Sequence, residues 1–178
     1  IGRSEGADID FSVEGYESIR VYTTRPDTLF GATFMVLAPE HPLVEVIIES
    51  PPEGCDGEKL SAYATEAKNR ADVDRMADSK DKSGVFSGLY ATNPATGKRI
   101  PVWIADYVLM GYGHGAIMAV PAHDQRDHDF ALQHNIEIIE VVKPDEETDG
   151  CFSGNGTSVN SASDILSINE MRTDEAKT

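Results

Sequence analysis

The sequence has little of several features that would place the chain in a specialised class of protein. It contains two cysteines, Cys55 and Cys151, which lie far apart and have no nearby cysteine or histidine at metal-ligand spacing. This spacing argues against a zinc site and favours two free thiols. No apolar run approaches the ~20 residues that a membrane helix needs, and the first residues do not resemble a signal peptide. We therefore expect a soluble protein of the cytoplasm or of an organelle matrix, not of a membrane.

Basic residues are also scarce. The chain has 15 Lys and Arg against 31 Asp and Glu, which gives a formal net charge of −16. Such a charge repels polyanions and argues against broad binding to a nucleic-acid backbone. Any contact with RNA must therefore be local, or be delivered by another part of a larger protein. The tail from 144 to 178 is rich in acidic residues and is the surface least suited to RNA.

The remaining composition is that of one globular domain. The 178 residues are 40% hydrophobic and 26% charged, a mixture that can bury a core. Residues 1–11 look like a linker running into a first strand, and the chain ends inside an expected helix. We therefore expect 1–178 to be a single domain cut from a larger protein, monomeric when isolated.

Local patterns predict a mixed α and β fold. Period-2 alternation or short apolar runs predict strands at 19–23, 33–38, within 85–110, at 116–120 and at 137–142. Helical spacing and start signals predict helices opening at 41–42, over 58–76, over 124–134 and from a capping-box pattern at 167–170. Residues 145–163 are rich in Gly, Ser, Asn and Asp and are expected to form a mobile loop. Many short strands with few helices favour a β-barrel-like core decorated by helices.

The first polar segment is residues 23–31, with the sequence TTRPDTLFG. Pro26 lacks an N–H donor and keeps Arg25 out of the helical region, so the chain must bend there. A bend with hydroxyls, one cation and one carboxylate at a strand end can present donors and acceptors to a polar ligand. The alternative is an ordinary turn in which threonine side chains cap the backbone.

The second polar segment runs from Gly113 to Asp127, where glycines and an apolar strand lead into a helix start. Asp124 and Asp127 both fall in the first helical turn, near its free N–H groups. They can be explained structurally, with Asp124 as the N-cap and Asp127 complementing the helix dipole. Beside a cleft, such a carboxylate can also bind the ammonium group of a substrate.

Two further chemistries have weaker support. His123, Asp124 and Asp127 could be a metal cluster, but the segment lacks a second histidine or a distant paired motif. We therefore expect no metal site. No serine or cysteine has an obvious base beside it, so the sequence does not predict a nucleophile.

Together the two segments resemble a known family. TTRPDTLFG at 23–31, followed about 85 residues later by YGHGAIMAVPAHDQRD at 112–127, closely resembles the editing domain, or connective peptide 1, of bacterial-type leucyl-tRNA synthetases. The opening IGRSEGA also resembles the peptide that enters this insertion. The resemblance covers roughly 1–142, and 145–178 only loosely. His114 stands where the family commonly has threonine.

The resemblance implies the editing-domain fold of class I aminoacyl-tRNA synthetases, a barrel-like core with a pocket for an aminoacylated adenosine. Asp127 would bind the α-ammonium group of the substrate, and Thr23 and Thr24 would contact the amino acid and the adenosine. Thr28 would act as the sieve that collides with leucine, and Arg25 would organise the site. The remaining substrate-binding residues implied by the resemblance are Asp124, Met118, Tyr112, Val120, Leu109 and Arg126.

The function implied is post-transfer editing, in which norvaline or isoleucine is hydrolysed from tRNA(Leu) and leucine is excluded; pre-transfer editing stays open. No cofactor is implied for editing, because ATP serves only the catalytic core, whose signatures this sequence lacks. The implied partners are the 3′-terminal adenosine of tRNA(Leu) and the rest of the synthetase in the same chain. Two rival functions remain, a module that holds a tRNA end without catalysis and a metal-dependent hydrolase using His123 and Asp124.

Overall fold

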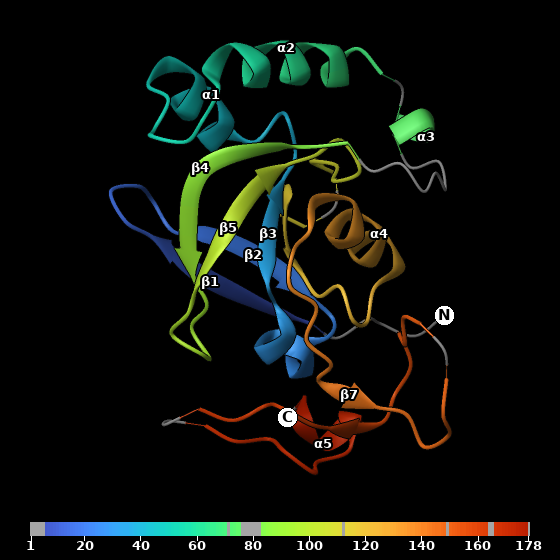
Figure 1. Cartoon of the computed structure of the whole chain (residues 1–178). Coiled ribbons are helices and arrows are strands. Elements are labelled where there is room, and N and C mark those ends of the chain that lie inside the picture. Colours follow the sequence, from blue (N-terminus) through green and yellow to red (C-terminus); the bar gives the residue numbers. More distant parts are fainter. Residues whose placement is uncertain are drawn as a thin grey trace.

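The core of the molecule is a six-stranded sheet with the order β2-β1-β4-β5-β3-β6 (Figure 1). The computed structural model describes residues 6–70, 72–75, 83–111, 113–148, 150–163 and 166–177. Among these residues, no helix is long and apolar enough to cross a membrane.

The sheet begins with an antiparallel hairpin of β1 (Ala7–Val13) and β2 (Ile19–Thr23). In β2, buried Ile19 and Val21 alternate with exposed residues, as the period-2 pattern predicted. β1 occupies part of the stretch that was expected to be a linker, and its end pairs with β4.

β3 (Phe34–Leu37) lies inside the sheet, parallel to β5 (Arg99–Ile104) and antiparallel to β6 (Ala116–Ala119). All four residues of β3 are buried, because packed side chains cover both of its faces. This explains why its sequence is a continuous apolar run rather than an alternating one. The predictions of strands at β3 and β6 are confirmed.

β4 (Val85–Thr92) pairs antiparallel with β5 through the turn that begins at Asn93. The Asn93 side chain accepts a hydrogen bond from Ala95 N and donates one to Leu29 O, at 2.9 and 2.8 Å. At the two ends of the strand order, β6 lies beside β2, so the sheet nearly closes into a barrel. The predicted barrel-like core is confirmed.

Two helices, α1 (Pro42–Glu49) and α2 (Gly57–Lys68), cover one end of the sheet (Figure 1). His41 Nδ1 accepts a hydrogen bond from Leu43 N and caps α1. The helical spacing of the sequence predicts Leu43, Val46 and Ile47 on one buried face. This is wrong in part, because Val46 is 47% exposed whereas Ile47 is buried.

The predicted helix over 58–76 is shorter than expected. α2 ends at Lys68, and a separate turn, α3 (Asp72–Arg75), follows. The chain turns there so that buried Arg75 reaches Glu40 and the carbonyl oxygens of Asp106 and Val108. These partners lie far away in the sequence, so helical spacing alone could not show the break.

The predicted helix over 124–134 is confirmed as α4 (Gln125–His134), which Asp124 caps. Asn135, in the left-handed conformation with a φ of 55°, ends it. Phe130 on its inner face stacks on Phe34 and meets Trp103 edge-on.

The predicted strand at 137–142 is wrong over most of its length, since β7 comprises only Val142–Lys143. Its partner is β8 (Thr157–Ser158), which lies inside the stretch expected to be a loop. Val141 N and Val142 N donate to the ring of His123.

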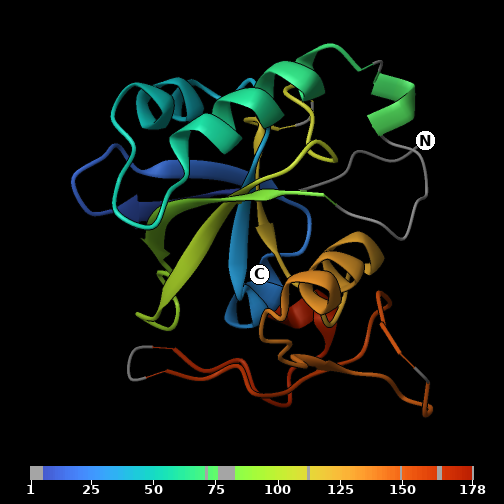
Figure 2. The ribbon, with the colours of Figure 1, turned by 45° about the horizontal axis from the view of Figure 1, so that its top comes forward.

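The predicted helix start at 167–170 is also wrong. Glu170 has a φ of 66°, and the Asn169 side chain accepts a hydrogen bond from Ser161 N, so this stretch is a turn. The last helix, α5 (Thr173–Ala176), begins after it, and there Glu175 accepts a hydrogen bond from Arg172 N. β7, β8 and α5 lie at the end of the sheet opposite to α1 and α2 (Figures 1 and 2).

Candidate functional site

The two polar segments singled out in the sequence meet in one cavity of about 410 Å³. They meet because β2 ends beside β6, so the bend after β2 faces the start of α4 across the barrel. A volume of this size is in the range of about 300–1,000 Å³ that small-molecule sites occupy. The residues that line the cavity are Tyr22, Thr23, Thr24, Arg25, Thr28, Ile117, Met118, Val120, His123, Asp124, Arg126 and Asp127.

The bend after β2 is a 3₁₀ helix, η1 (Pro26–Gly31). Thr23 Oγ1 accepts a hydrogen bond from Arg25 N at 2.9 Å, which is the backbone capping expected of a threonine in a turn. Thr28 is buried, and its hydroxyl donates to Arg25 O at 2.7 Å. The threonines thus stabilise the turn, as the alternative interpretation of this segment predicted, and they also line the cavity.

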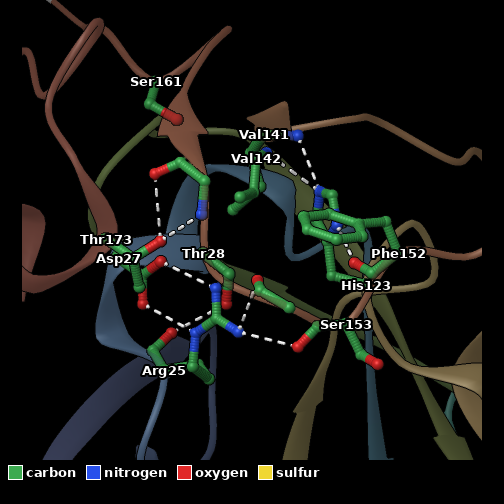
Figure 3. Close-up of polar contacts among 12 residues, drawn as sticks. Arg25, Asp27, Thr28, His123, Val141, Val142, Phe152, Ser153, Ser161 and Thr173 are labelled. Atoms are coloured by element: carbon green, nitrogen blue, oxygen red, sulfur yellow. Dashed lines mark hydrogen bonds and ion pairs between the residues drawn. The ribbon is translucent and has the colours of Figure 1, made fainter. Parts of the chain in front are cut away.

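Arg25 directs its guanidinium away from solvent and into a salt bridge with Asp27 (Figure 3). Nε and Nη2 donate to the two carboxylate oxygens at 3.1 and 3.0 Å, a bidentate geometry. The Asp27 side chain is fully buried. The cation and the carboxylate that the sequence placed in the bend therefore neutralise each other inside the protein.

Asp127 is the buried charged group of the cavity, with only 4% of its surface exposed. Its carboxylate accepts hydrogen bonds from Tyr107 Oη at 2.9 Å and from Val120 N at 3.1 Å. Burial, and then the negative charge of Asp124, raise the pKa of Asp127 to about 7. A carboxylate in this state gains strongly from a cation placed next to it.

Asp124 has the structural role that the sequence suggested for it. Its Oδ1 accepts hydrogen bonds from Arg126 N and Asp127 N, at 2.9 and 3.1 Å, and so caps α4. The Arg126 side chain is about half exposed and lies 3.9 Å from the same oxygen. Both residues line the cavity at its exposed side.

His123 is held by the backbone on both sides of its ring (Figure 3). Nε2 accepts hydrogen bonds from Val141 N and Val142 N at 2.9 and 3.0 Å, so Nδ1 carries the proton and donates to Phe152 O at 2.6 Å. Burial lowers the pKa of His123, which keeps the ring neutral.

The ring nitrogens of His123 are thus occupied and cannot bind a metal without losing these contacts. Within the described ranges, no group of three or more His, Cys, Asp or Glu residues is arranged to hold a metal ion. Cys55 and Cys151 are free thiols, as expected.

Two of the predicted site residues are not placed at the cavity. Leu109 is buried, 7% exposed, and is not among the lining residues. Tyr112 lies outside the described residues. The other predicted residues line the cavity together.

Sequence reasoning missed the residues that support the site. Tyr107 donates a hydrogen bond to Asp127 and lies 20 positions earlier, in a stretch whose pattern predicts only strands and turns. Ile117 and Tyr22 line the cavity, and neither was singled out. Strand alternation places Ile117 on the face of β6 opposite to Met118, so it gave no signal for Ile117. Nothing in the sequence pairs Tyr107 with Asp127.

A second and larger hollow, of about 980 Å³, lies against α2. It is lined by Asp56, Glu58 and Glu66 together with small and apolar residues, and by none of the motif residues. The smaller cavity with its buried carboxylate is the better candidate for a site, because it joins both motifs and encloses a perturbed titratable group.

Comparison with known proteins identifies the family of the chain. A family model described as "Leucyl-tRNA synthetase, editing domain" matches residues 1–178. The chain belongs to this family. The match includes residues 145–178, where the motif resemblance was loose.

Relatives of the family are similar to the chain over nearly its whole length. The leucine--tRNA ligase of Rubrobacter xylanophilus is 57% identical over 166 residues, covering 90% of the chain and 20% of the ligase. That of Corynebacterium glutamicum strain R is 52% identical over 189 residues, covering 99% of the chain and 20% of the ligase. The chain thus spans about a fifth of the length of these relatives.

A solved structure has the same fold. It is the LeuRS of Agrobacterium radiobacter K84 agnB2 in a ternary complex with tRNA and LeuAMS, with a TM-score of 0.66 and 35% sequence identity. The similarity covers 86% of the chain and 18% of that protein.

Proposed function

We propose that the domain hydrolyses the ester bond between tRNA(Leu) and a wrong amino acid, such as norvaline or isoleucine, and spares leucine. Water adds to the ester carbonyl, the bond to the ribose oxygen of the terminal adenosine breaks, and the free amino acid and intact tRNA leave. This is post-transfer editing. Membership of the editing-domain family supports it, as does the tRNA bound to the similar LeuRS structure.

The observation that carries the proposal is the buried carboxylate of Asp127, which lies across the cavity from residues 23–28, the bend after β2 that we call the threonine bend. Buried charge is expensive unless it is paired, and among the described residues Asp127 has hydrogen-bond donors, Tyr107 and Val120, but no ion pair. The α-ammonium group of an aminoacyl ester is the partner that such a site favours. Binding it would anchor the amino acid at one end of the cavity.

The bend would then select the side chain of the amino acid. Thr28 is buried and fixed through its hydroxyl to Arg25 O, so its side chain cannot easily move aside. Met118 and Val120, which are also buried, form an apolar wall of the cavity. We assign exclusion of leucine to Thr28, and contacts with the adenosine and the ester to Thr23 and Thr24.

Hydrolysis in this cavity does not require a side-chain nucleophile. The hydroxyls of Thr23 and Thr28 are bonded to the backbone, and both ring nitrogens of His123 are bonded as well. Neither threonine therefore pairs with His123 as a nucleophile with its base. An aminoacyl ester is already reactive. Holding it beside a positioned water and donors for the oxyanion supplies much of the rate enhancement.

A hydrolytic pocket is useful because the pocket in which a synthetase activates its amino acid discriminates poorly between similar side chains. A hydrophobic pocket distinguishes a missing or displaced methylene by only about 1–3 kcal/mol. A second, hydrolytic pocket that excludes leucine multiplies the two selectivities.

We propose that the 3′-terminal adenosine is the part of tRNA that enters the cavity, and that the rest of the synthetase, in the same chain, provides most of the affinity. The net charge of −16 supports this division, since the isolated domain repels the tRNA backbone. The isolated domain would be a monomer. The reaction would occur where tRNA is charged, in the cytoplasm or an organelle matrix.

The test is single-turnover hydrolysis of norvalyl-, isoleucyl- and leucyl-tRNA(Leu) with protein in excess. The wild-type chain should accelerate the first two at least 10-fold over leucyl-tRNA, and Asp127→Asn should lose this activity. Asp129→Asn, on the same helix but paired with Gln125, is the matched control and should remain active. Equal rates for all three esters, or for wild type and Asp127→Asn, would refute the proposal.

Two rival functions predict different results. A module that only holds a tRNA end would bind adenosine tightly and hydrolyse no ester. A metal-dependent hydrolase would lose activity after treatment with EDTA and regain it with added metal. We propose that editing here needs no cofactor, so full activity should remain after chelation.

A further inference from the structure

The short segment 151–156, which we call the strap, lies directly against the threonine bend (Figure 3). Arg25 Nη1 donates to the carbonyl oxygens of Ser153 and Gly154, at 3.2 and 3.3 Å. These contacts join residues separated by nearly 130 positions. The strap therefore touches the site through a residue that lines its cavity.

The remaining contacts of Arg25 show what it does there. Nε and Nη2 are bound to the buried carboxylate of Asp27, so every nitrogen of the guanidinium group has a partner within the protein. Arg25 O in turn accepts hydrogen bonds from both the backbone N–H and the hydroxyl of Thr28. A shift of Arg25 would thus carry Thr28 with it.

The strap is fastened to the other half of the cavity as well. The carbonyl oxygen of Phe152 accepts a hydrogen bond from the ring of His123, the residue directly before the cap of α4. The strap consequently bridges the two segments, the bend and the helix start, that face each other across the cavity.

A residue outside the cavity holds the strap from behind. Thr173, at the start of α5, is 2% exposed, and its hydroxyl accepts from Gly156 N at 2.8 Å and donates to Gly156 O at 3.2 Å. Gly156 is itself tightly placed, because a Cβ there would lie 2.1 Å from Lys143 O. The end of the strap is thereby fixed between β7 and α5.

We propose that the strap is a positioning element of the editing site, in which Thr173 fixes the strap and Arg25 and His123 transmit its position to the two halves of the cavity. Arg25 is then a positioning residue for Thr28 and does not contact the substrate. This inference rests on the proposed editing function. Selection of an amino acid by one methyl group needs walls held to a fraction of an ångström, which the strap supplies.

The test compares Thr173→Val, which keeps the shape of the side chain but removes its hydroxyl, with Thr173→Ser, which keeps the hydroxyl. In Thr173→Val we expect hydrolysis of norvalyl-tRNA(Leu) at saturating protein to slow at least 5-fold, and the preference over leucyl-tRNA to fall at least 5-fold. Thr173→Ser should restore both. Asp145→Asn, which breaks an exposed ion pair with Arg172 in the same part of the chain, should change neither.

Amide hydrogen exchange supplies a readout that is independent of activity. The amide of Thr28, bonded to Arg25 O, should exchange at least 5-fold faster in Thr173→Val than in wild type, whereas that of Leu60 in α2 should not change. Unchanged Thr28 exchange and unchanged selectivity in a Thr173→Val protein whose Gly156 amide exchanges faster would overturn the proposal.

Arg25→Lys tests the same link if Thr173→Val does not fold. Lysine keeps the charge beside Asp27 but cannot span Asp27 and the strap carbonyls at once. Faster exchange of the Gly154 and Gly156 amides would support the link, and unchanged exchange would overturn it. If wild type hydrolyses no mischarged tRNA, the proposed function fails, but the exchange data still decide whether strap and bend are coupled.

Discussion

The carboxylate of Asp127 and the hydroxyl of Tyr107 share a hydrogen bond of 2.9 Å between two side chains that are almost fully buried. Burial raises the pKa of both groups, so Tyr107 stays protonated and donates to Asp127. The tyrosine fixes one carboxylate oxygen and Val120 N fixes the other. The carboxylate is therefore held in one orientation before a substrate arrives.

Replacing Asp127 by asparagine should separate activity from stability. The charge-assisted contact with the ammonium group would be lost, and kcat/KM for norvalyl-tRNA(Leu) should fall about 100-fold, or about 3 kcal/mol. Because the folded-state pKa is raised to about 7, the stabilising contribution of Asp127 is present below its unfolded pKa and is lost as the pH rises through 7. At pH 8, Asp127→Asn should thus be more stable than wild type by roughly 1–3 kcal/mol. Urea unfolding at pH 8 measures this difference, and a variant less stable than wild type would contradict it.

The pH dependence of editing should follow the ionisation of Asp127. In the free protein the carboxylate must lose its proton to bind an ammonium group, so kcat/KM should rise as the pH increases through about 7. Asp124→Asn keeps a good helix cap but removes a charge that raises the pKa of Asp127, so the rise should shift to lower pH. The measurement is kcat/KM from pH 5.5 to 8, corrected for spontaneous ester hydrolysis. Identical profiles for wild type and Asp124→Asn would show that another group controls the rate.

Thr28→Ala should open the cavity to leucine. The substitution removes a buried methyl and hydroxyl, and hydrolysis of leucyl-tRNA(Leu) should increase at least 10-fold. Thr28→Val fills the same space without the hydrogen bond to Arg25 O and should keep leucine out. Deacylation of leucyl-tRNA by the two variants checks this, and continued protection of leucyl-tRNA in Thr28→Ala would remove Thr28 from its assigned role.

We expect the loss of the His123 side chain to destabilise the folded protein, because its ring accepts two backbone hydrogen bonds. His123→Ala would leave the N–H groups of Val141 and Val142 buried without an acceptor, and should destabilise the protein by about 2–4 kcal/mol. Its folded-state pKa is lowered, so its contribution is complete above its unfolded pKa near 6.5 and is lost as the pH falls below that value. Thermal unfolding at pH 5 and 7 measures both effects. The control is His114→Thr at an exposed position, which should change stability by less than about 0.5 kcal/mol.

Much of the fold could be predicted because its signals are local. The alternation in β2, the apolar run of β3 and the cap at Asp124 each depend on neighbouring residues. The errors occur where distant partners decide the structure. The N–H groups of Val141 and Val142 bond to His123, and of the strand expected there only Val142 pairs with another strand. The pattern at 167–170 forms a turn tied to Ser161.

The site was predictable in a different way. Its two segments were visible as unusual polar runs, but their meeting in one cavity follows from β2 lying beside β6, which no local pattern shows. The resemblance to the editing-domain family supplied that link. The roles of Tyr107 and of the strap were not predictable, because Tyr107 bonds across the fold and the strap contacts use backbone carbonyls of any sequence.

The parallel pairing of β3 with β5 has a consequence for how the protein is made. Strands that run parallel need a long crossover, and here α1, α2, α3 and β4 separate the two. Contacts between residues so remote in sequence form slowly and late. During synthesis on the ribosome, the bend after β2 emerges early but must wait for β6 and α4 before any cavity exists. A partly synthesised domain is therefore expected to be unable to hydrolyse esters, so editing would begin only when folding is nearly complete.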